Sequence, residues 1–598
     1  MLNLSANNYI KHILLAFLVF YTVMAQGGFF VIALIVLNIF FLFAIVFGKE
    51  NIKWDMAMVL FCGLFGIMAI SSIFSFSFDA AVKELLKYAL FPLAYGFFQK
   101  HIKDQRDGDK IRNIFYGGFV ILMVFGMLGI LGLSPIDGMV TNLGGRLQSF
   151  FQYANTTALA MGIGGFYATE KFRNTKKWFH LIMAALFFVA LILTLSRVGF
   201  VIFVLCYLLY VFQFIKLKIK ILLLGGLGGL MAILVATSSR IAQISIFAPT
   251  LVERYISYFD ALGMMARNPF GIGLGNWQFL QFYYQSAPYQ VFYIHNAYLQ
   301  IGLDGGFLAL LIFLVAIGII TPPTKSCASC LSFCQTASSA PPSVPRAHVV
   351  VASLRFDKNP AQSCARFSWW SNIFVKTRKC IHFYIGIFIL ISSFFEVHFN
   401  FGIIIIYFMF LLAMLNRDKQ SLKVPKIPFG KYVKYTAFLP IAALMVLLVS
   451  NILVSFGTHL ESRGQTADAY RIFTNAHNIN PLSDELYINK ARTSPEPHQA
   501  LQHLYAAHNI NNWNTLTLYM LAQNHIILGN FEEAFTHADN LLEIFPFGVA
   551  NQNLLREIIG MFEYESRANL FERLERRIEI INNGINPLFR HISADFSY

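Results

Sequence analysis

The sequence is poor in charge. Only 13% of its 598 residues are Asp, Glu, Lys or Arg and 57% are hydrophobic, whereas a soluble globular domain carries about 25% charged residues. The mean hydropathy of +0.57 excludes an ordinary soluble protein for most of the chain. Polarity rises only near the C-terminus, so we expect a membrane domain over residues 1–458 and a small polar domain over 459–598.

Apolar runs long enough to cross a bilayer recur through the first domain, and we count about thirteen. They predict an all-α fold, a polytopic helical bundle of about 12–13 spans. The first run also fits a cleavable signal peptide, which would leave the later topology unchanged. The runs are residues 11–25, 28–47, 55–75, 81–98, 112–133, 154–169, 178–195, 198–214, 220–236, 297–320, 383–398, 402–416 and 435–456.

The formal charge of +15 is unevenly distributed, which favours membrane topology over a nucleic-acid partner. Short loops on one side hold most of the lysines, which places that side and the N-terminus in the cytoplasm. The outer loops lack lysine apart from Lys83 and Lys87, at the outer end of the fourth run. Their basic residues are otherwise arginines, whose planar fork suits phosphate oxygens. The outer arginines are Arg146, Arg197, Arg240, Arg254 and Arg267.

An anionic, phosphate-bearing, lipid-linked ligand on the outer face is the simplest interpretation of these arginines. The alternative is that they cap helices or pair with Glu253 and Asp260. The outer loops also lack an acidic cluster for a divalent cation, because Glu253, Asp260 and Asp304 are scattered. We therefore predict no metal site and no cofactor.

Three outer segments could carry chemistry. Arg197 lies in the tight turn Thr194-Leu195-Ser196-Arg197-Val198-Gly199 between two apolar runs, where a charge marks a function or snorkels to lipid head groups. Arg146 precedes a span, among alternating polar and aromatic residues. The long outer loop 237–296 ends in Tyr293-Ile294-His295-Asn296, and histidine is the side chain type best suited to proton exchange in general acid–base chemistry. Its aromatic run Trp277–Gln285 suits either sugar faces or a helix lying in the interface.

Three features of this region together resemble the O-antigen ligase superfamily. They are the Thr-x-Ser-Arg-x-Gly setting of Arg197, then Arg254 followed by Asn268-Pro269-Phe270-Gly271-Ile272-Gly273-Leu274-Gly275-Asn276, and finally His295-Asn296-Ala297-Tyr298-Leu299-Gln300. This superfamily includes O-antigen polymerases and bacterial O-linked oligosaccharyltransferases. The resemblance covers mainly residues 140–310. One departure is Leu303-Asp304-Gly305-Gly306, where the family often has Glu before glycine, and we assign Asp304 no catalytic role.

The resemblance implies a multi-pass enzyme of the bacterial cytoplasmic membrane. It would transfer a glycan, without a metal, from a polyprenyl-diphosphate carrier to a hydroxyl of a glycolipid, polysaccharide or protein acceptor on the outer face. Arg197 and Arg254 would hold the diphosphate and stabilise the leaving group, and His295 would activate or orient the hydroxyl. We expect substrate contacts from Arg146, Arg267, Asn296, Gly273 and Gly275. The alternatives are a polymerase of the same superfamily and a transporter or flippase of lipid-linked glycans; a scaffold would leave the Arg and His residues unexplained.

Residues 321–382 change character, with several prolines and serines and five of the seven cysteines. On this topology the segment is a cytoplasmic loop, where disulfides are rare. Cys327-x-x-Cys330 has no second pair at zinc-site spacing. The segment is therefore either an irregular inner loop or an artefact of the sequence.

The polar C-terminal domain contains an internal repeat. Ala476-His477-Asn478-Ile479-Asn480 recurs as Ala507-His508-Asn509-Ile510-Asn511, at a period typical of helical hairpins. Gly529, Ala534, Ala538 and Pro546 also fall at offsets of a tetratricopeptide-like repeat. We predict a short solenoid over about 459–580, outside the membrane, that recruits an acceptor or a protein partner.

Overall fold

The computed structural model describes residues 2–47, 52, 54–142, 144–215, 249–318, 381–417 and 438–585. Within these ranges every element is a helix, apart from an isolated bridge between Val140 and Leu147, which confirms the predicted all-α class. Some of the predictions lie outside the described residues. They concern the apolar run 220–236, Arg240, and nearly all of the inner segment 321–382, with Cys327 and Cys330.

The structure has a helix at twelve of the thirteen predicted apolar runs; the remaining run, 220–236, lies outside the described residues. Four of them are long and apolar enough to span a membrane: α5, α13, α19 and the stretch Met56–Phe74 that begins with α3. The chain is a multi-pass membrane protein. The bounds are α1 Leu2–Met24, α2 Val31–Phe47, α3 Met56–Ser71, α4 Phe78–His101, α5 Gln105–Ile130, α6 Ala154–Thr175, α7 Trp178–Leu193, α8 Arg197–Val211, α13 Ala297–Gly318, α16 Ile381–Ser392, α17 Gly402–Asn416 and α19 Phe438–Ser462.

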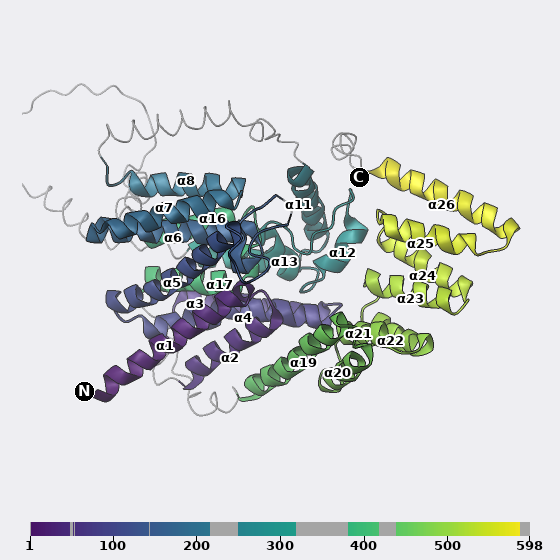
Figure 1. Cartoon of the computed structure of the whole chain (residues 1–598), viewed down its shortest axis with the longest axis horizontal. Coiled ribbons are helices and arrows are strands. Elements are labelled where there is room, and N and C mark those ends of the chain that lie inside the picture. The colour runs from purple at the N-terminus through teal and green to yellow at the C-terminus, as the bar shows by residue number, and fades with distance from the viewer. Residues whose placement is uncertain are drawn as a thin grey trace, which may run out of the picture.

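Helix α17 lies within the bundle, and every side chain from Ile403 to Ala413 is buried. Its aromatic rings meet those of neighbouring helices, as Phe410 meets Phe98 of α4 with ring centroids 5.5 Å apart. Lipid provides little hydrophobic drive between helices, so this close packing has to supply the association. Helix α17 therefore lies in the interior of the bundle, among the helices of the membrane domain (Figure 1).

The predicted outer loop is not irregular throughout. It contains α11, Pro249–Arg267, and α12, Trp277–Tyr284. These helices and the following segment share a small apolar core that includes Ile256, Trp277 and Ile294. The segment 285–296 therefore packs against α12 and leads directly into α13.

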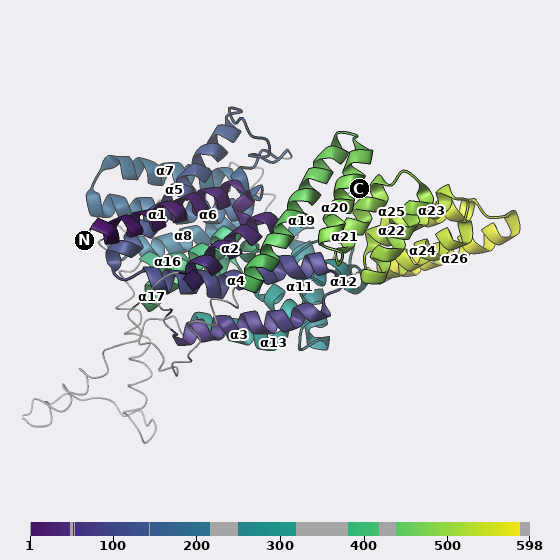
Figure 2. The ribbon, with the colours of Figure 1, turned by 90° about the horizontal axis from the view of Figure 1, so that it is seen from below.

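The last apolar helix, α19, continues into the polar domain without a break, so the boundary expected at 458–459 falls inside it. Gly457 in its last turns lies against the Phe473 ring of α20. Consecutive helices then pack side by side and extend away from the bundle (Figures 1 and 2). They are α20 Thr466–Ile479, α21 Asp484–Thr493, α22 Pro497–Ile510, α23 Thr515–Ile527, α24 Phe531–Ile544, α25 Val549–Gly560 and α26 Tyr564–Gly584. We call α20–α26 the repeat array; its tetratricopeptide-like nature stays a prediction.

Candidate active site

The Glu396 carboxylate contacts side chains from three other segments of the chain. It lies in the loop between α16 and α17 and is only 4% exposed. Oε1 accepts from Arg254 Nη2 at 2.6 Å and from Asn155 Nδ2 at 2.7 Å. Oε2 accepts from the Tyr153 hydroxyl and lies 3.3 Å from His295 Nδ1. One carboxylate thus links α6, α11 and the start of α13.

The pKa of Glu396 shows that these partners outweigh its burial. Burial alone would raise the pKa, because it disfavours the charged form. The hydrogen bond from His295 and the charges of Arg254, His295 and His398 act in the opposite direction and lower it to about 2. Glu396 is therefore ionised throughout the neutral range, and Arg254 is held beside a full negative charge.

His295 is fixed at one ring nitrogen and at its backbone. Nδ1 faces Glu396 and lies 3.3 Å from the Tyr153 hydroxyl. The His295 carbonyl accepts a hydrogen bond from the Tyr258 hydroxyl. Since the side chain is 23% exposed, Nε2 is the ring nitrogen left to meet a ligand. A carboxylate at Nδ1 and an available Nε2 are what a general base requires.

Arg254 pairs with this carboxylate, Arg146 is linked to it through Asn155, and Arg197 lies close enough to Arg146 to interact with it. Arg254 also donates to the Phe395 carbonyl at 3.1 Å. Arg146 donates to the Thr194 carbonyl at 3.0 Å and to Asn155 Oδ1 at 2.9 Å. Burial lowers the pKa of Arg146, and the charges of Arg254 and Arg197 lower it further. Arg197, the first residue of α8, is exposed.

The charges of this group do not cancel. Arg146, Arg197 and Arg254 carry three positive charges against the one negative charge of Glu396, which leaves two. Glu253 lies close enough to interact with His295 and Arg254, but burial raises its pKa; when ionised it leaves one positive charge. A surplus of positive charge at a half-buried site favours an anionic ligand.

The structure does not bring Arg267 to this group. Arg267 is at the opposite end of α11 from Arg254, roughly 20 Å along the helix. It is exposed, with its guanidinium 5.9 Å from the Tyr284 ring centroid.

Asn296 is next to His295, but its side chain accepts from the backbone amides of Tyr298 and Leu299 at 3.0 and 3.1 Å. It therefore caps the N-terminus of α13.

Residues 182–314 match the model of the O-antigen ligase family. This part of the chain is similar to an O-antigen ligase domain. The matched region runs from α7 into α13 and includes Arg197, Arg254 and His295, whereas Arg146 and Glu396 fall outside it. No curated protein matches the chain. This match supports a membrane enzyme of the O-antigen ligase and polymerase type, a family that implies a lipid-linked glycan donor and a glycan or protein acceptor.

Two glycines of the matched region lie in a close contact with the segment ahead of α4 and its first turn. Gly273 has φ +95°, and a Cβ there would come within 2.6 Å of the Phe74 carbonyl. A Cβ at Gly275 would come within 2.9 Å of Ala80. Asn276 strengthens this contact by donating to the Phe74 carbonyl at 2.9 Å and accepting from the Phe76 amide at 2.8 Å. The run 268–276 therefore joins the loop ahead of α4, and these contacts are structural.

Gly306 makes a testable contact in the same region. Its φ of +77° and ψ of −178° interrupt α13, a backbone region essentially restricted to glycine. The Phe307 amide donates to the Pro269 carbonyl at 3.0 Å, and a Cβ on Gly306 would come within 2.4 Å of that oxygen. We expect Gly306→Ala to lower the free energy of unfolding by about 3 kcal/mol or more.

Thermal unfolding of the purified protein in detergent would measure this loss. Gly263→Ala is the matched control, because Gly263 lies within α11 with nothing within 4 Å of a built Cβ. Alanine there should be neutral or stabilising. Equal stability of the two variants would remove the structural role assigned to the break in α13.

Glu396 is a functional residue that the sequence prediction missed, although its position carries a signal. The predicted run 383–398 included it, and an ionisable residue in an apolar run is a functional candidate by default. In the structure α16 ends at Ser392, so Glu396 lies in a loop at the end of the bundle. Tyr153 and Asn155 precede or begin α6 and give no comparable signal, because aromatic and amide side chains are common at helix ends.

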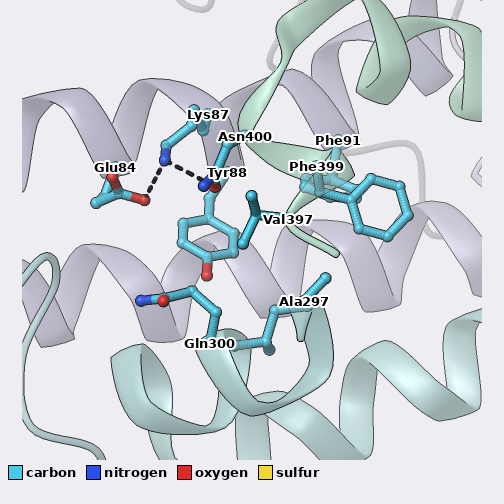
Figure 3. A pocket seen from close by; sticks show the side chains of 10 residues that line it. Glu84, Lys87, Tyr88, Phe91, Ala297, Gln300, Val397, Phe399 and Asn400 are labelled. Atoms are coloured by element: carbon cyan, nitrogen blue, oxygen red, sulfur yellow. Dashed lines mark hydrogen bonds and ion pairs between the residues drawn. The ribbon is translucent and has the colours of Figure 1, made fainter. Parts of the chain in front are cut away.

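A narrow cavity borders the site between α4, the start of α13 and the loop at Val397 (Figure 3). The Lys87 ammonium is 2.6 Å from Glu84 and donates to Asn400 Oδ1 at 3.1 Å. The Tyr293 hydroxyl donates to Glu84 at 3.0 Å. The cavity has a volume of about 20 Å³, which is room for about one water molecule. Lys87 is thus neutralised internally and supports the loops that carry Glu396 and His295.

Proposed function

We propose that the chain transfers a glycan from a polyprenyl-diphosphate carrier to an acceptor hydroxyl at the outer face of the bacterial cytoplasmic membrane, without a metal ion. The observation that carries this proposal is the Glu396 carboxylate, which holds His295 and Arg254 together. A base and a cation fixed by one buried group match the two requirements of the reaction. One is removal of a proton from the acceptor, and the other is stabilisation of the departing diphosphate.

In the proposed reaction the acceptor oxygen attacks the anomeric carbon of the donor glycan. The bond between that carbon and the phosphate oxygen breaks, and the polyprenyl diphosphate leaves with the electron pair. His295 Nε2 takes the hydroxyl proton as the new glycosidic bond forms. Glu396 at Nδ1 stabilises the resulting imidazolium and keeps the ring oriented, as a carboxylate does for histidine bases in general.

The arginines serve the other half of the reaction. A diphosphate is a good leaving group, so the main need is to stabilise its negative charge. Arg254 is held in place by Glu396, Arg146 by Thr194 and Asn155, and Arg197 is exposed at the end of α8. Their surplus positive charge complements the two negative charges of a diphosphate diester. Ligation, polymerisation and protein O-glycosylation share this chemistry, and we favour ligation to a macromolecular acceptor because the repeat array offers a second surface.

Arg254→Lys tests the assignment of the diphosphate. Lysine keeps the charge but loses the planar fork, so we expect transfer to fall roughly tenfold to a hundredfold, consistent with about 1.5–3 kcal/mol for a charge-assisted hydrogen bond. The measurement is glycan transfer from a polyprenyl-diphosphate oligosaccharide by protein reconstituted in liposomes. Arg267→Lys, on the same helix but at its far end, should transfer at the wild-type rate. If both variants lose activity equally, Arg254 has no special role.

A further inference from the structure

Trp513 of the repeat array contacts the O-antigen ligase region. It lies in the turn between α22 and α23. Its indole stacks on the Phe76 ring, with centroids 5.9 Å apart and an interplanar angle of 17°. It also meets the Tyr283 ring edge-on at 5.7 Å. Phe76 precedes α4 and Tyr283 belongs to α12, so one side chain touches two segments of the membrane domain.

A chain of buried hydrogen bonds fixes the turn that carries Trp513. The Trp513 amide donates to Asn511 Oδ1 at 3.2 Å, and Asn511 Nδ2 donates to Asp484 Oδ2 at 3.2 Å. The Ser77 hydroxyl of the membrane domain donates to the other oxygen, Asp484 Oδ1, at 2.7 Å. Ser77, Asp484 and Asn511 are all less than 5% exposed. Asn511 ends the second copy of the recurrent Ala-His-Asn-Ile-Asn motif, which gives this motif residue a definite role.

The serines that cap one helix of each domain also form hydrogen bonds across the interface between the domains. Ser77 caps α4 by accepting from the Ala80 amide at 3.3 Å, and Ser483 caps α21 by accepting from the Leu486 amide at 3.1 Å. The Ser77 hydroxyl donates to Asp484, and the Ser483 hydroxyl donates to Asp79 at 2.5 Å. Each aspartate belongs to the first turn of its helix, and burial together with the charge of Glu485 raises the pKa of Asp79 to about 7. The repeat array is thus held firmly on the N-terminus of α4.

Helix α12 connects Trp513 to the segment that carries His295. The Trp277 indole donates to the Val291 carbonyl at 3.0 Å, and Gln281 Oε1 accepts from the Val291 amide at 2.9 Å. Ile294, immediately before His295, is fully buried in the same apolar core as Trp277, and Trp513 packs at the edge of that core. A displacement of α12 would therefore move residues 291–295.

We propose that Trp513 is a positioning residue for His295, and that the repeat array clamps α12 and the segment 285–296 in the reactive position. The catalytic consequence rests on the proposed function, whereas the mechanical one does not. A misplacement of a reacting group by about 1 Å can cost roughly a hundredfold in rate. The arginines near Glu396 are held by contacts that do not involve Trp513, so loss of the clamp should lower turnover and leave donor binding intact.

The experiment combines amide hydrogen exchange with transfer kinetics on the full-length protein. For Trp513→Ala we expect the Val291 and Ile294 amides to exchange at least about tenfold faster and kcat to fall roughly tenfold or more. The donor KM should remain within about twofold. Trp513→Phe keeps an aromatic contact with Phe76 and should restore most of both. Leu516→Ala, which removes an exposed side chain three residues away in α23, should match the wild type in both measurements.

Tyr283→Ala removes the partner ring from the membrane side and leaves the repeat array unchanged, so it separates loss of the clamp from unfolding of the array. It should reproduce the faster exchange at residues 291–294 with wild-type exchange in α24 and α25. Wild-type exchange at residues 291–294 in both Trp513→Ala and Tyr283→Ala would overturn the clamp, and so would faster exchange with unchanged kcat. If the wild-type protein transfers no glycan, the proposed function fails, and the exchange data still decide whether the clamp exists.

Discussion

His295→Ala should lose glycan transfer by about 10²- to 10⁴-fold, the usual contribution of a general base, while donor binding changes by less than about twofold. The reason is that the imidazole accepts the acceptor proton in the proposed reaction, whereas the arginines provide the binding of the diphosphate. Transfer by the reconstituted protein and binding of the radiolabelled donor would measure the two effects separately.

His459→Ala is the matched control for this experiment. His459 lies in α19, is exposed, and is remote in sequence from the site, so its loss should leave both transfer and binding unchanged. A His295→Ala protein that inserts normally and transfers at the wild-type rate would remove the base from the mechanism. Loss of donor binding together with transfer would instead assign His295 to the diphosphate.

Glu396→Gln should have the second large effect, a fall in transfer of roughly a hundredfold or more. The amide keeps the size of the side chain but removes the negative charge that pairs with Arg254 and stabilises the protonated His295. It also leaves Arg254 as a half-buried cation without its counter-ion, which is destabilising. Transfer kinetics and thermal unfolding should therefore both change.

Glu170→Gln provides the comparison, because Glu170 is also a largely buried carboxylate paired with an arginine, Arg112 at 3.2 Å. It lies near the C-terminal end of α6, far along the helix from Tyr153 and Asn155, so its loss can lower stability without lowering transfer.

The Glu396 pKa of about 2 also predicts how stability depends on pH. A lowered carboxyl pKa stabilises the fold above its unfolded value near 4.5, and this contribution is lost as the pH falls towards 2. The Glu396→Gln protein should lack this pH-dependent contribution to stability. Wild-type transfer by the same variant would show that Glu396 does not support His295 as the base.

The helices of the bundle could be predicted because their apolar runs have the length of a bilayer. Prediction failed where a helix ended early. Composition alone extended the run 383–398 through Glu396, since the residues on either side of the carboxylate are apolar. The structure ends α16 at Ser392 because the Ser393 carbonyl instead accepts from the Ala297 amide at 2.9 Å. That contact joins residues about a hundred positions apart, and a single sequence contains no record of it.

The candidate site was predictable in its chemistry but not in its arrangement. Histidine and arginine at the ends of apolar runs indicated a base and an anion site. The choice among the arginines depended on α11, a helix within what the sequence presented as a long loop. The sequence predicted a role on the diphosphate for Arg254 and a substrate contact for Arg267, and the helix places these two arginines toward opposite ends. Gly273 and Gly275 matched a family motif, and their positive φ values tie them to backbone contacts instead.

Transfer from a defined polyprenyl-diphosphate oligosaccharide to a hydroxyl acceptor, by the purified wild-type protein in the presence of EDTA, tests the central claim most directly. Glycosylated acceptor and free polyprenyl diphosphate should appear in equal amounts, and the His295→Ala protein should form both at least about a hundredfold more slowly. Tight donor binding without any product, over a range of lipid, polysaccharide and protein acceptors, would contradict the account and favour a transporter of lipid-linked glycans.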